Sequence, residues 1–401
     1  MAREKTNIKN VYYDDEKKLY YARLYYGVVD GKKKTEWETF VKKSEAKTRV
    51  NNFEADKIRE ELAIPSKVTV KQWLEQWYND VVLYNNEITT QEGYKTIIYK
   101  HLIPKLGNMQ LQKLTEKHIK KYYKEKQTEP NGYKKNGEPK PPLSSNTVRK
   151  HHTLLMTALT AAKEEHLIKS NPLESKTLKA PEYVKPEISF YDLDNLLKLF
   201  DIVYDNNIEP AIYLAGTTAL RREEISGLRW DCVDFKKHDM LIRRSDVRAF
   251  NKIHTKKPKN ETSTRRISMP DELYEVLERH KKMQYENKKL MGDAYNSVDI
   301  EKNYVIVDDL GYQINPATLS SSFLKLIRKY DLPSVSLRGL RHTVASVLND
   351  NGMTLYDISK LLGHASTDIT SKVYVEMFSP DNRKATQTMA NAISAAKKKT
   401  K

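Results

Sequence analysis

Residues 218–230 read TALRREEISGLRW, and the sequence predicts helices before this stretch and short strands after it. Upstream, apolar residues recur at helical spacing and predict one helix over 191–205 and a second over 208–217. Arg221 opens a further helix directly after the second one, and Pro270 starts another. Three short segments between those two residues alternate like strands of a small antiparallel sheet: 232–235, 240–245 and 265–269. This part of the chain is therefore expected to be a mixed α/β domain.

The composition favours a polyanionic partner. The 401 residues include 70 Lys+Arg and 53 Asp+Glu, which gives a formal charge of +17. Each lysine or arginine that meets a phosphate releases condensed counterions, which makes binding favourable. The alternative is a basic surface that only keeps the chain soluble. The single cysteine, Cys232, excludes an internal disulfide framework and a zinc site built from several thiolates.

The hydropathy pattern argues against a membrane protein. The hydrophobic fraction is 39%, and no apolar run reaches 18 residues. The N-terminal MAREKTNIKN lacks the apolar stretch of a secretory signal. We therefore expect a cytoplasmic, nucleoid-associated protein with no membrane partner.

Residues 1–66 are expected to form a domain of three strands and one helix. The segments DDEKK and DGKKK suit hairpin turns between strands over 10–13, 19–28 and 34–41. A helix capped by Ser44 follows, and Pro65 closes it.

Residues 67–174 are expected to form an all-helical domain. Its first helix places Trp73 and Trp77 on one face, where core packing is the simplest role. Between residues 111 and 150, eleven Lys/Arg and four Asp/Glu are interleaved with Tyr122, Tyr123, Tyr133 and His118, a density that favours contacts with backbone phosphates. The Pro/Gly/Lys insert TEPNGYKKNGEPKPPL is interpreted as a mobile connection between helices. The candidate DNA-binding residues of the two domains are Lys32, Lys33, Lys34, Lys120, Lys121, Lys124, Lys134, Lys135, Arg149 and Lys150.

Residues 175–187, with two prolines, are expected to link this domain to a third domain over 188–384. The segment 385–401 is an amphipathic helix candidate with a basic end. Two interpretations stay open for it, a docking helix for a neighbouring subunit and a frayed tail.

Several common hydrolase motifs are absent from the sequence. It has no Walker phosphate loop, no HExxH, no GxSxG, and no carboxylates spaced as a two-metal nuclease needs. No metal site and no cofactor are therefore expected. What the last 180 residues carry is a series of basic residues, each of which taken alone suits an ordinary surface ion pair or a solvated turn.

Taken in order, those residues form a known pattern. From 188 to 377 the chain resembles the tyrosine recombinase family of the phage lambda integrase type. TALRREEISGLRW resembles the family's first box, KPKNETSTRRISMP its strand-turn-strand with a lysine, SLRGLRHTVAS its second box, and LLGHASTDITSKVYVEM its last box. The residues that these boxes assign to catalysis are Arg221 with its supporting acid Glu224, Lys259, Arg341, His364 and the nucleophile Tyr374.

The resemblance implies chemistry that needs neither metal nor ATP. A tyrosine hydroxyl attacks a DNA phosphate, and two guanidiniums stabilise the negative charge of the transition state. A 3′-phosphotyrosyl bond then conserves the energy of the broken phosphodiester. Lys259 would protonate the departing 5′-oxygen, and His364 would hydrogen-bond the same phosphate.

The second box departs from the family's usual His-x-x-Arg, because position 338 holds an arginine. Arg338 could donate hydrogen bonds to a phosphate, but it cannot accept a proton near neutral pH. The neighbouring His342 points about 100° away from Arg341 on a helix, so we interpret it as a structural residue.

The upstream domains resemble the family's arm-binding and core-binding domains. Together the domains imply a multidomain, mainly α protein with small β-sheets: a three-stranded sheet with one helix, a helical core-binding domain and a mixed α/β catalytic domain. The implied function is integration and excision of a phage or conjugative element by a homotetramer on double-stranded DNA with core and arm sites. Whether an excisionase and a host DNA-bending protein take part is left open. A type IB-like topoisomerase and a non-catalytic DNA-binding regulator remain as alternatives.

Overall fold

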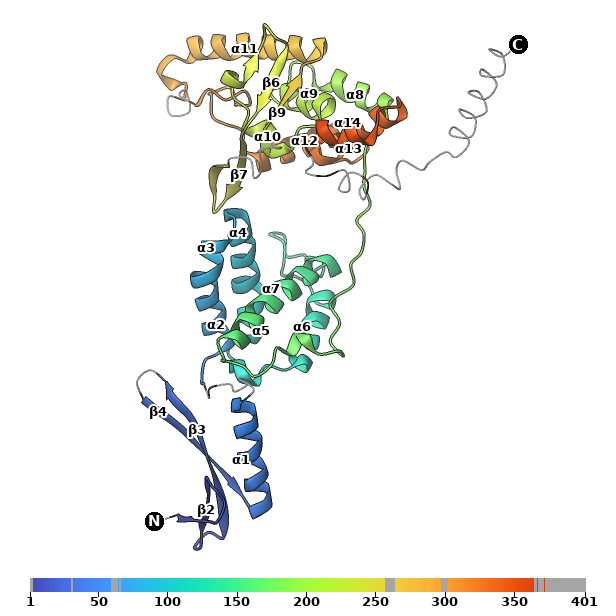
Figure 1. The fold of residues 1–401 in the computed structure, drawn as a ribbon. Helices are drawn as coiled ribbons and strands as arrows, with labels where there is room; N and C mark the ends of the chain where they lie inside the picture. The colour runs from blue at the N-terminus through green and yellow to red at the C-terminus, as the bar shows by residue number, and fades with distance from the viewer. Residues whose placement is uncertain are drawn as a thin grey trace, which may run out of the picture. The chain divides into compact units, whose positions relative to one another are not determined.

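The computed structural model describes residues 3–29, 32–58, 64, 66–256, 264–296, 302–363, 366 and 371. The chain divides into two compact units, Met1–Lys185 and Pro186–Lys401, and Figure 1 shows the elements of each. Within the described ranges, no helix is both long and apolar enough to cross a membrane.

The first unit begins with an antiparallel sheet in the order β1-β2-β3-β4, covered by helix α1 (Lys43–Ile58). Ala46, Val50 and Phe53 of α1 pack on Val11, Ala22 and Leu24 of the sheet. The sheet has one strand more than the sequence indicates. The additional strand, β1, was not predicted because it has only two residues, which is too few to show an alternating pattern. The four strands are β1 (Glu4–Lys5), β2 (Val11–Asp14), β3 (Leu19–Val29) and β4 (Lys32–Phe40).

The rest of the first unit is helical. Trp73 and Trp77 are buried as expected, and the Trp73 indole N–H donates to the Ala158 carbonyl at 2.9 Å. Two of the helical runs contain a π-helical turn, at Tyr78–Val82 and at Ile98–Leu102. The α-helices are α2 (Val70–Trp77), α3 (Leu83–Asn85), α4 (Ile88–Ile97), α5 (Ile103–Leu106), α6 (Glu116–Thr128) and α7 (Ser145–Glu164), with 3-10 turns at Leu111–Lys113 and Pro172–Glu174.

Two loops of this unit form hydrogen bonds that the sequence did not indicate. The insert before α7 closes as a small hairpin, in which the Lys134 N–H donates to the Glu138 carbonyl at 2.8 Å and the Lys140 N–H to the Gly132 carbonyl at 2.8 Å. The expected linker lacks helices and strands, but its residues 181–184 contact α7. There the Asn146 side chain forms two hydrogen bonds with the backbone of Val184. The sequence analysis did not predict the backbone pairing of the insert, because the paired residues show no alternation of apolar and polar side chains.

The second unit is built around a buried helix, α9 (Glu209–Thr218), and the sequence predicts most of it. Ala211, Ile212, Leu214 and Ala215 are all fully buried, so apolar side chains surround α9 on several sides. The other helices are α8 (Leu193–Val203), α10 (Arg222–Ser226), α11 (Asp271–Met291), α12 (Pro316–Lys329), α13 (Leu337–Asp350) and α14 (Leu355–Leu362), with 3-10 turns at Trp230–Cys232 and Gly292–Ala294.

The expected three-stranded antiparallel sheet is present in this unit, in the order β5-β6-β9. Its strands are β5 (Val233–Asp234), β6 (Asp239–Ile242) and β9 (Arg265–Ser268). A second hairpin, which the sequence did not reveal, pairs β7 (Ser245–Ala249) with β8 (Lys252–Lys256). Its two turn residues, Phe250 and Asn251, both have left-handed backbone angles, with φ of 49° and 60°.

Candidate active site

Arg221 stands at the start of α10, where the chain turns sharply after α9. Helix α9 ends at Thr218, and the next residue, Ala219, has the left-handed φ of 53° and is fully buried. Arg221 then caps α10: its backbone N–H donates to Glu224 Oε2 at 2.8 Å, and its Nη1 donates to Glu224 Oε1 at 2.9 Å. The Arg221 side chain remains 37% exposed. The turn therefore presents a guanidinium that is held by an acid and still reaches the surface.

Glu224 is shared between two arginines. Arg265, on β9, donates from Nη1 to Glu224 Oε1 at 3.1 Å and from Nη2 to Oε2 at 3.0 Å. Burial acts to raise the pKa of Glu224, but the hydrogen bonds and charge of Arg265, together with Arg221, outweigh it and hold that pKa below its usual range. Glu224 is therefore a buried carboxylate that stays ionised. Sequence reasoning missed Arg265, although the pair in TRRIS was the available signal.

Arg341 lies in α13 and is only 5% exposed. Its Nη1 donates to the Ala219 carbonyl at 2.7 Å, and its Nη2 donates to the Leu362 carbonyl at 2.5 Å. A buried guanidinium is tolerated when its N–H groups find acceptors. Carbonyls supply acceptors without neutralising the charge, so Arg341 remains a cation inside the fold.

The end of α14 joins these arginines. The carbonyls of three consecutive residues each accept from a different guanidinium: Leu361 from Arg265 at 3.2 Å, Leu362 from Arg341 at 2.5 Å and Gly363 from Arg221 at 3.0 Å. The last carbonyls of a helix lack partners within the helix and carry partial negative charge, which suits cations. We call Arg221, Arg265, Arg341 and Glu224 the arginine cluster.

Gly363 is required for this arrangement. It ends α14 in the left-handed conformation, with φ of 60°. A Cβ atom at this position would lie 2.9 Å from Arg265 Nη1. Glycine therefore provides both the backbone turn and the space for the arginine.

Arg338 and His342 lie on the same helix as Arg341 but differ in exposure. Arg338 is exposed in the first turn of α13. His342 is buried, and burial with the charges of Arg338 and Arg341 lowers its pKa to about 4. His342 is therefore a neutral, buried residue near neutral pH.

Three of the expected catalytic residues, Lys259, His364 and Tyr374, lie outside the described residues, as does the segment 385–401. Their place in the sequence relates two of them to the arginine cluster. His364 directly follows Gly363, and Lys259 falls between the end of β8 and the start of β9, which begins with Arg265. The structure thus brings together Arg221, Glu224 and Arg341, and adds Arg265 to them.

Comparison with known proteins identifies the family. The sequence model of the phage integrase family matches residues 191–379, and that of the phage integrase N-terminal SAM-like domain matches residues 69–127. The chain belongs to the phage integrase family. The first match contains the whole arginine cluster, and the second covers α2 to α6 of the helical part.

Individual integrases and recombinases show the same similarity. A protein named tyrosine recombinase XerC-like from Caldanaerobacter subterraneus subsp. tengcongensis is 28% identical over 259 residues, which cover 61% of this chain and 66% of that protein. The ICEBs1 integrase of Bacillus subtilis is 24% identical over 315 residues, covering 76% of this chain and 79% of its own. The solved structure of the Tn1549 transposon integrase with a circular intermediate DNA has a TM-score of 0.62 at 18% identity, over 76% of this chain and 94% of that one. The last comparison establishes the integrase fold.

The ten basic residues expected to bind DNA in this family member are all exposed. Lys32, Lys33 and Lys34 belong to β4, not to the turn before it. Lys120 pairs with Glu116 at 3.4 Å and Lys121 with Glu125 at 3.8 Å, along α6. Pairs this exposed contribute little stability, so they leave the lysines available for phosphates.

The remaining members of that set differ in their contacts. Lys134 pairs with Glu138 at 2.7 Å inside the small hairpin. Arg149 donates from Nη1 to the backbone carbonyl of Pro181 at 2.8 Å, so it helps to hold the linker against α7. Tyr122 and Tyr123, which are interleaved with these basic residues in the sequence, are buried and hydrogen-bonded to His151 and His152, because α6 turns that face toward α7.

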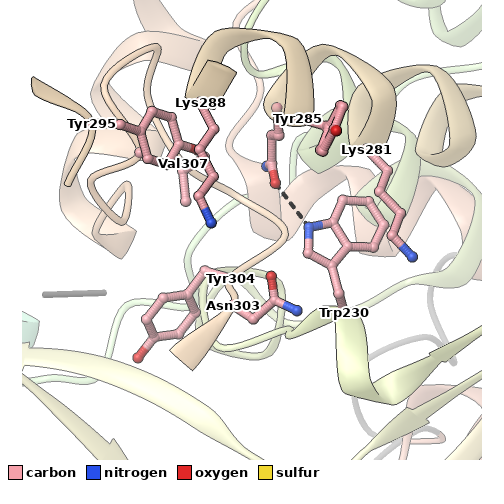
Figure 2. A pocket seen from close by; sticks show the side chains of 10 residues that line it. Trp230, Lys281, Tyr285, Lys288, Tyr295, Asn303, Tyr304 and Val307 are labelled. Atoms are coloured by element: carbon pink, nitrogen blue, oxygen red, sulfur yellow. Dashed lines mark hydrogen bonds between the residues drawn. The ribbon is translucent and has the colours of Figure 1, made fainter. Parts of the chain in front are cut away.

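A pocket of the second unit lies apart from the arginine cluster. It is lined by Trp230, the basic side chains Lys281 and Lys288 of α11, and tyrosines (Figure 2). The Trp230 indole N–H donates to Gln284 Oε1 at 2.8 Å across its wall. None of the arginines of the cluster lines it. Within the described ranges, no group of His, Cys, Asp and Glu is arranged to hold a metal ion.

Proposed function

We propose that this integrase family member is a site-specific tyrosine recombinase, which integrates and excises a mobile DNA element by cutting and rejoining strands through a 3′-phosphotyrosyl bond. The observation that carries the proposal is the meeting of Arg221 and Arg341 at the carbonyls of Gly363 and Leu362, directly before His364 in the sequence. DNA is the partner, which the charge of +17 supports. The Tn1549 relative was solved in complex with DNA.

The reaction follows from the residue types. The Tyr374 hydroxyl oxygen forms a bond to phosphorus and releases its proton to solvent water, while the bond from phosphorus to the 5′-oxygen breaks. Lys259 gives a proton to that oxygen. Arg221 and Arg341 donate to the non-bridging oxygens, on which negative charge builds in the transition state, and His364 donates to the same phosphate. The 5′-hydroxyl of a partner strand then attacks the phosphotyrosine and releases Tyr374.

The test uses a nicked suicide substrate, from which the cleaved 5′ end diffuses away. Tyr374→Phe should abolish the denaturant-resistant protein–DNA adduct and leave DNA affinity nearly unchanged, because the substitution removes only the hydroxyl nucleophile. Tyr356→Phe is the matched control, since Tyr356 is exposed on α14. An adduct that persists in the Tyr374→Phe protein would refute the assignment.

The same assay separates the alternatives. A recombinase exchanges strands between two distinct sites, whereas a type IB-like topoisomerase religates the original strand of one duplex. A DNA-binding regulator forms no adduct at all. Exchange between two differently labelled duplexes by the parental protein supports recombination, and relaxation without exchange supports the topoisomerase.

The finer organisation is also part of the proposal. Residues 1–66 bind arm sites, 67–174 and 188–384 hold the core site, 175–187 link them, and four copies assemble on two DNA partners in the cytoplasm at the nucleoid. The exposed Lys32, Lys33 and Lys34 on β4 support an arm-binding role. Deleting residues 1–66 should spare cleavage of core DNA and impair recombination of substrates with full flanks. Equal recombination by the truncated protein would contradict arm binding. An excisionase and a host DNA-bending protein can be tested by adding each to this assay.

A further inference from the structure

Strand β9 carries two adjacent arginines that face opposite sides of the sheet. Arg266 is 58% exposed and pairs with Asp239 at 3.0 Å. Arg265 is only 10% exposed and points at Glu224. Neighbouring side chains on a strand point to opposite faces. Arg265 therefore forms a buried ion pair, whereas Arg266 forms one at the surface.

Arg265 uses three N–H groups, and all three go to parts of the arginine cluster. Two form the bidentate pair with Glu224, and the third, Nε, donates to the Leu361 carbonyl at 3.2 Å. The arginine therefore connects β9, the acid of α10 and the end of α14. Its planar fork fixes the plane of the carboxylate, which a lysine cannot do.

Arg265 also limits how Arg221 can bind Glu224. Glu224 Oε1 accepts from Arg265 Nη1 at 3.1 Å and from Arg221 Nη1 at 2.9 Å, while Oε2 accepts from Arg265 Nη2 and from the Arg221 backbone. The Arg221 side chain therefore has one bond to the acid and one to Gly363. Without Arg265, a buried carboxylate would lack its main partner and would draw the Arg221 guanidinium into a tighter, bidentate pair.

We propose that Arg265 is a positioning residue for strand cleavage: it holds the Glu224 carboxylate so that the Arg221 guanidinium stays directed at the scissile phosphate. This role rests on the proposed function of Arg221. Arg265 itself touches no substrate in this scheme, and its effect on the reaction passes through Arg221.

The experiment is a double-mutant cycle in the full-length protein, with single-turnover cleavage of the suicide substrate and DNA affinity measured in parallel. Arg265→Gln should lower the cleavage rate by on the order of 10-fold to 10²-fold and change affinity less than twofold, because the defect lies in transition-state contacts. In an Arg221→Ala background, the same change should cost less than twofold, because the residue through which it acts is gone. Arg266→Gln, next along the strand, should cleave at the parental rate.

A second variant guards against a folding defect. Arg265→Lys keeps a positive charge beside Glu224 but loses the fork, so it should retain the melting temperature within a few degrees and still show the rate loss. Parental cleavage by Arg265→Lys, or an equal loss from Arg265→Gln with and without Arg221, would overturn the positioning role. A parental protein that forms no adduct would instead refute the proposed function, and the role of Arg265 with it.

Discussion

A buried histidine in the helical part of the first unit makes the stability of that part dependent on pH. His151 on α7 is 1% exposed and is hydrogen-bonded to the Tyr122 hydroxyl of α6 at 2.8 Å. The His101 ring lies 4.9 Å away, centroid to centroid. Burial, then the charges of His101 and Lys126, lower the pKa of His151 to about 3.

The sign and size follow from proton linkage. The unfolded chain takes up a proton on this histidine near pH 6.5 and the folded chain does so only near pH 3, so the stabilisation is present above pH 6.5 and is lost as the pH falls toward 3. Each pH unit in that window costs about 1.4 kcal/mol, so a change from pH 8 to pH 5 lowers the free energy of unfolding by about 2 kcal/mol through His151 alone. The pKa values of His101 and His152 are also lowered by burial, which adds to the loss in the same direction.

The assay is amide hydrogen exchange in rising urea, measured by mass spectrometry on peptides of α6 and α7 at pH 8 and pH 5. His151→Gln keeps a group that can pair with Tyr122 and does not titrate, so its two unfolding free energies should differ by about 2 kcal/mol less than those of the parental protein. His166→Asn is the control, because His166 is exposed and its left-handed backbone tolerates asparagine. The same pH dependence in His151→Gln and the parental protein would refute the reasoning.

Two further predictions concern α13 and α14. Arg338→Ala should lower cleavage by on the order of 10²-fold if the exposed Arg338 donates to the scissile phosphate, and Arg338→His should retain far more activity; parental cleavage by Arg338→Ala would remove it from the active site. Gly363→Ala should lower the melting temperature and the cleavage rate together, since it costs about 1 kcal/mol in the left-handed backbone and also displaces Arg265. Gly352→Ala has the same backbone cost at φ of 83° with open space around it, so it should lower only the melting temperature; a parental cleavage rate in Gly363→Ala would contradict the contact with Arg265.

Periodicity and local boxes were enough to predict most elements of the second unit, because α8, α9 and the β5-β6-β9 sheet follow apolar patterns. The β7-β8 hairpin lacked such a signal. Its turn uses Phe250 and Asn251 in left-handed conformations, where the common sequence is Asn-Gly or Asp-Gly. Its strands are also largely polar, so they show no clear alternation.

The sequence was enough to predict several residues of the candidate site, but not the hydrogen bonds and ion pairs that join them. The boxes indicate Arg221, Glu224 and Arg341 as members of one site. The contacts that orient them join residues about a hundred or more positions apart, such as Arg265 with Leu361 and Arg221 with Gly363. Such pairs depend on how α14 packs against β9 and α10, and a single sequence carries no local sign of that packing. The same limit explains why the sequence did not reveal the pairing of Tyr122 and Tyr123 with His151 and His152.

A phosphate-binding site in a fold needs cations that are held in place by hydrogen bonds but are not neutralised by acids, so that their charge can still act on the phosphate. The arginine cluster meets both requirements. The four side chains that define the cluster, three guanidiniums and one carboxylate, carry a formal charge of +2. The carbonyls of Ala219, Leu361, Leu362 and Gly363 each accept a hydrogen bond from one of these guanidiniums without cancelling its charge. A second acid in place of those carbonyls would hold the arginines as firmly but would leave less charge for the transition state. The end of a helix, with carbonyls that have no partner of their own, therefore suits this role better than another ion pair.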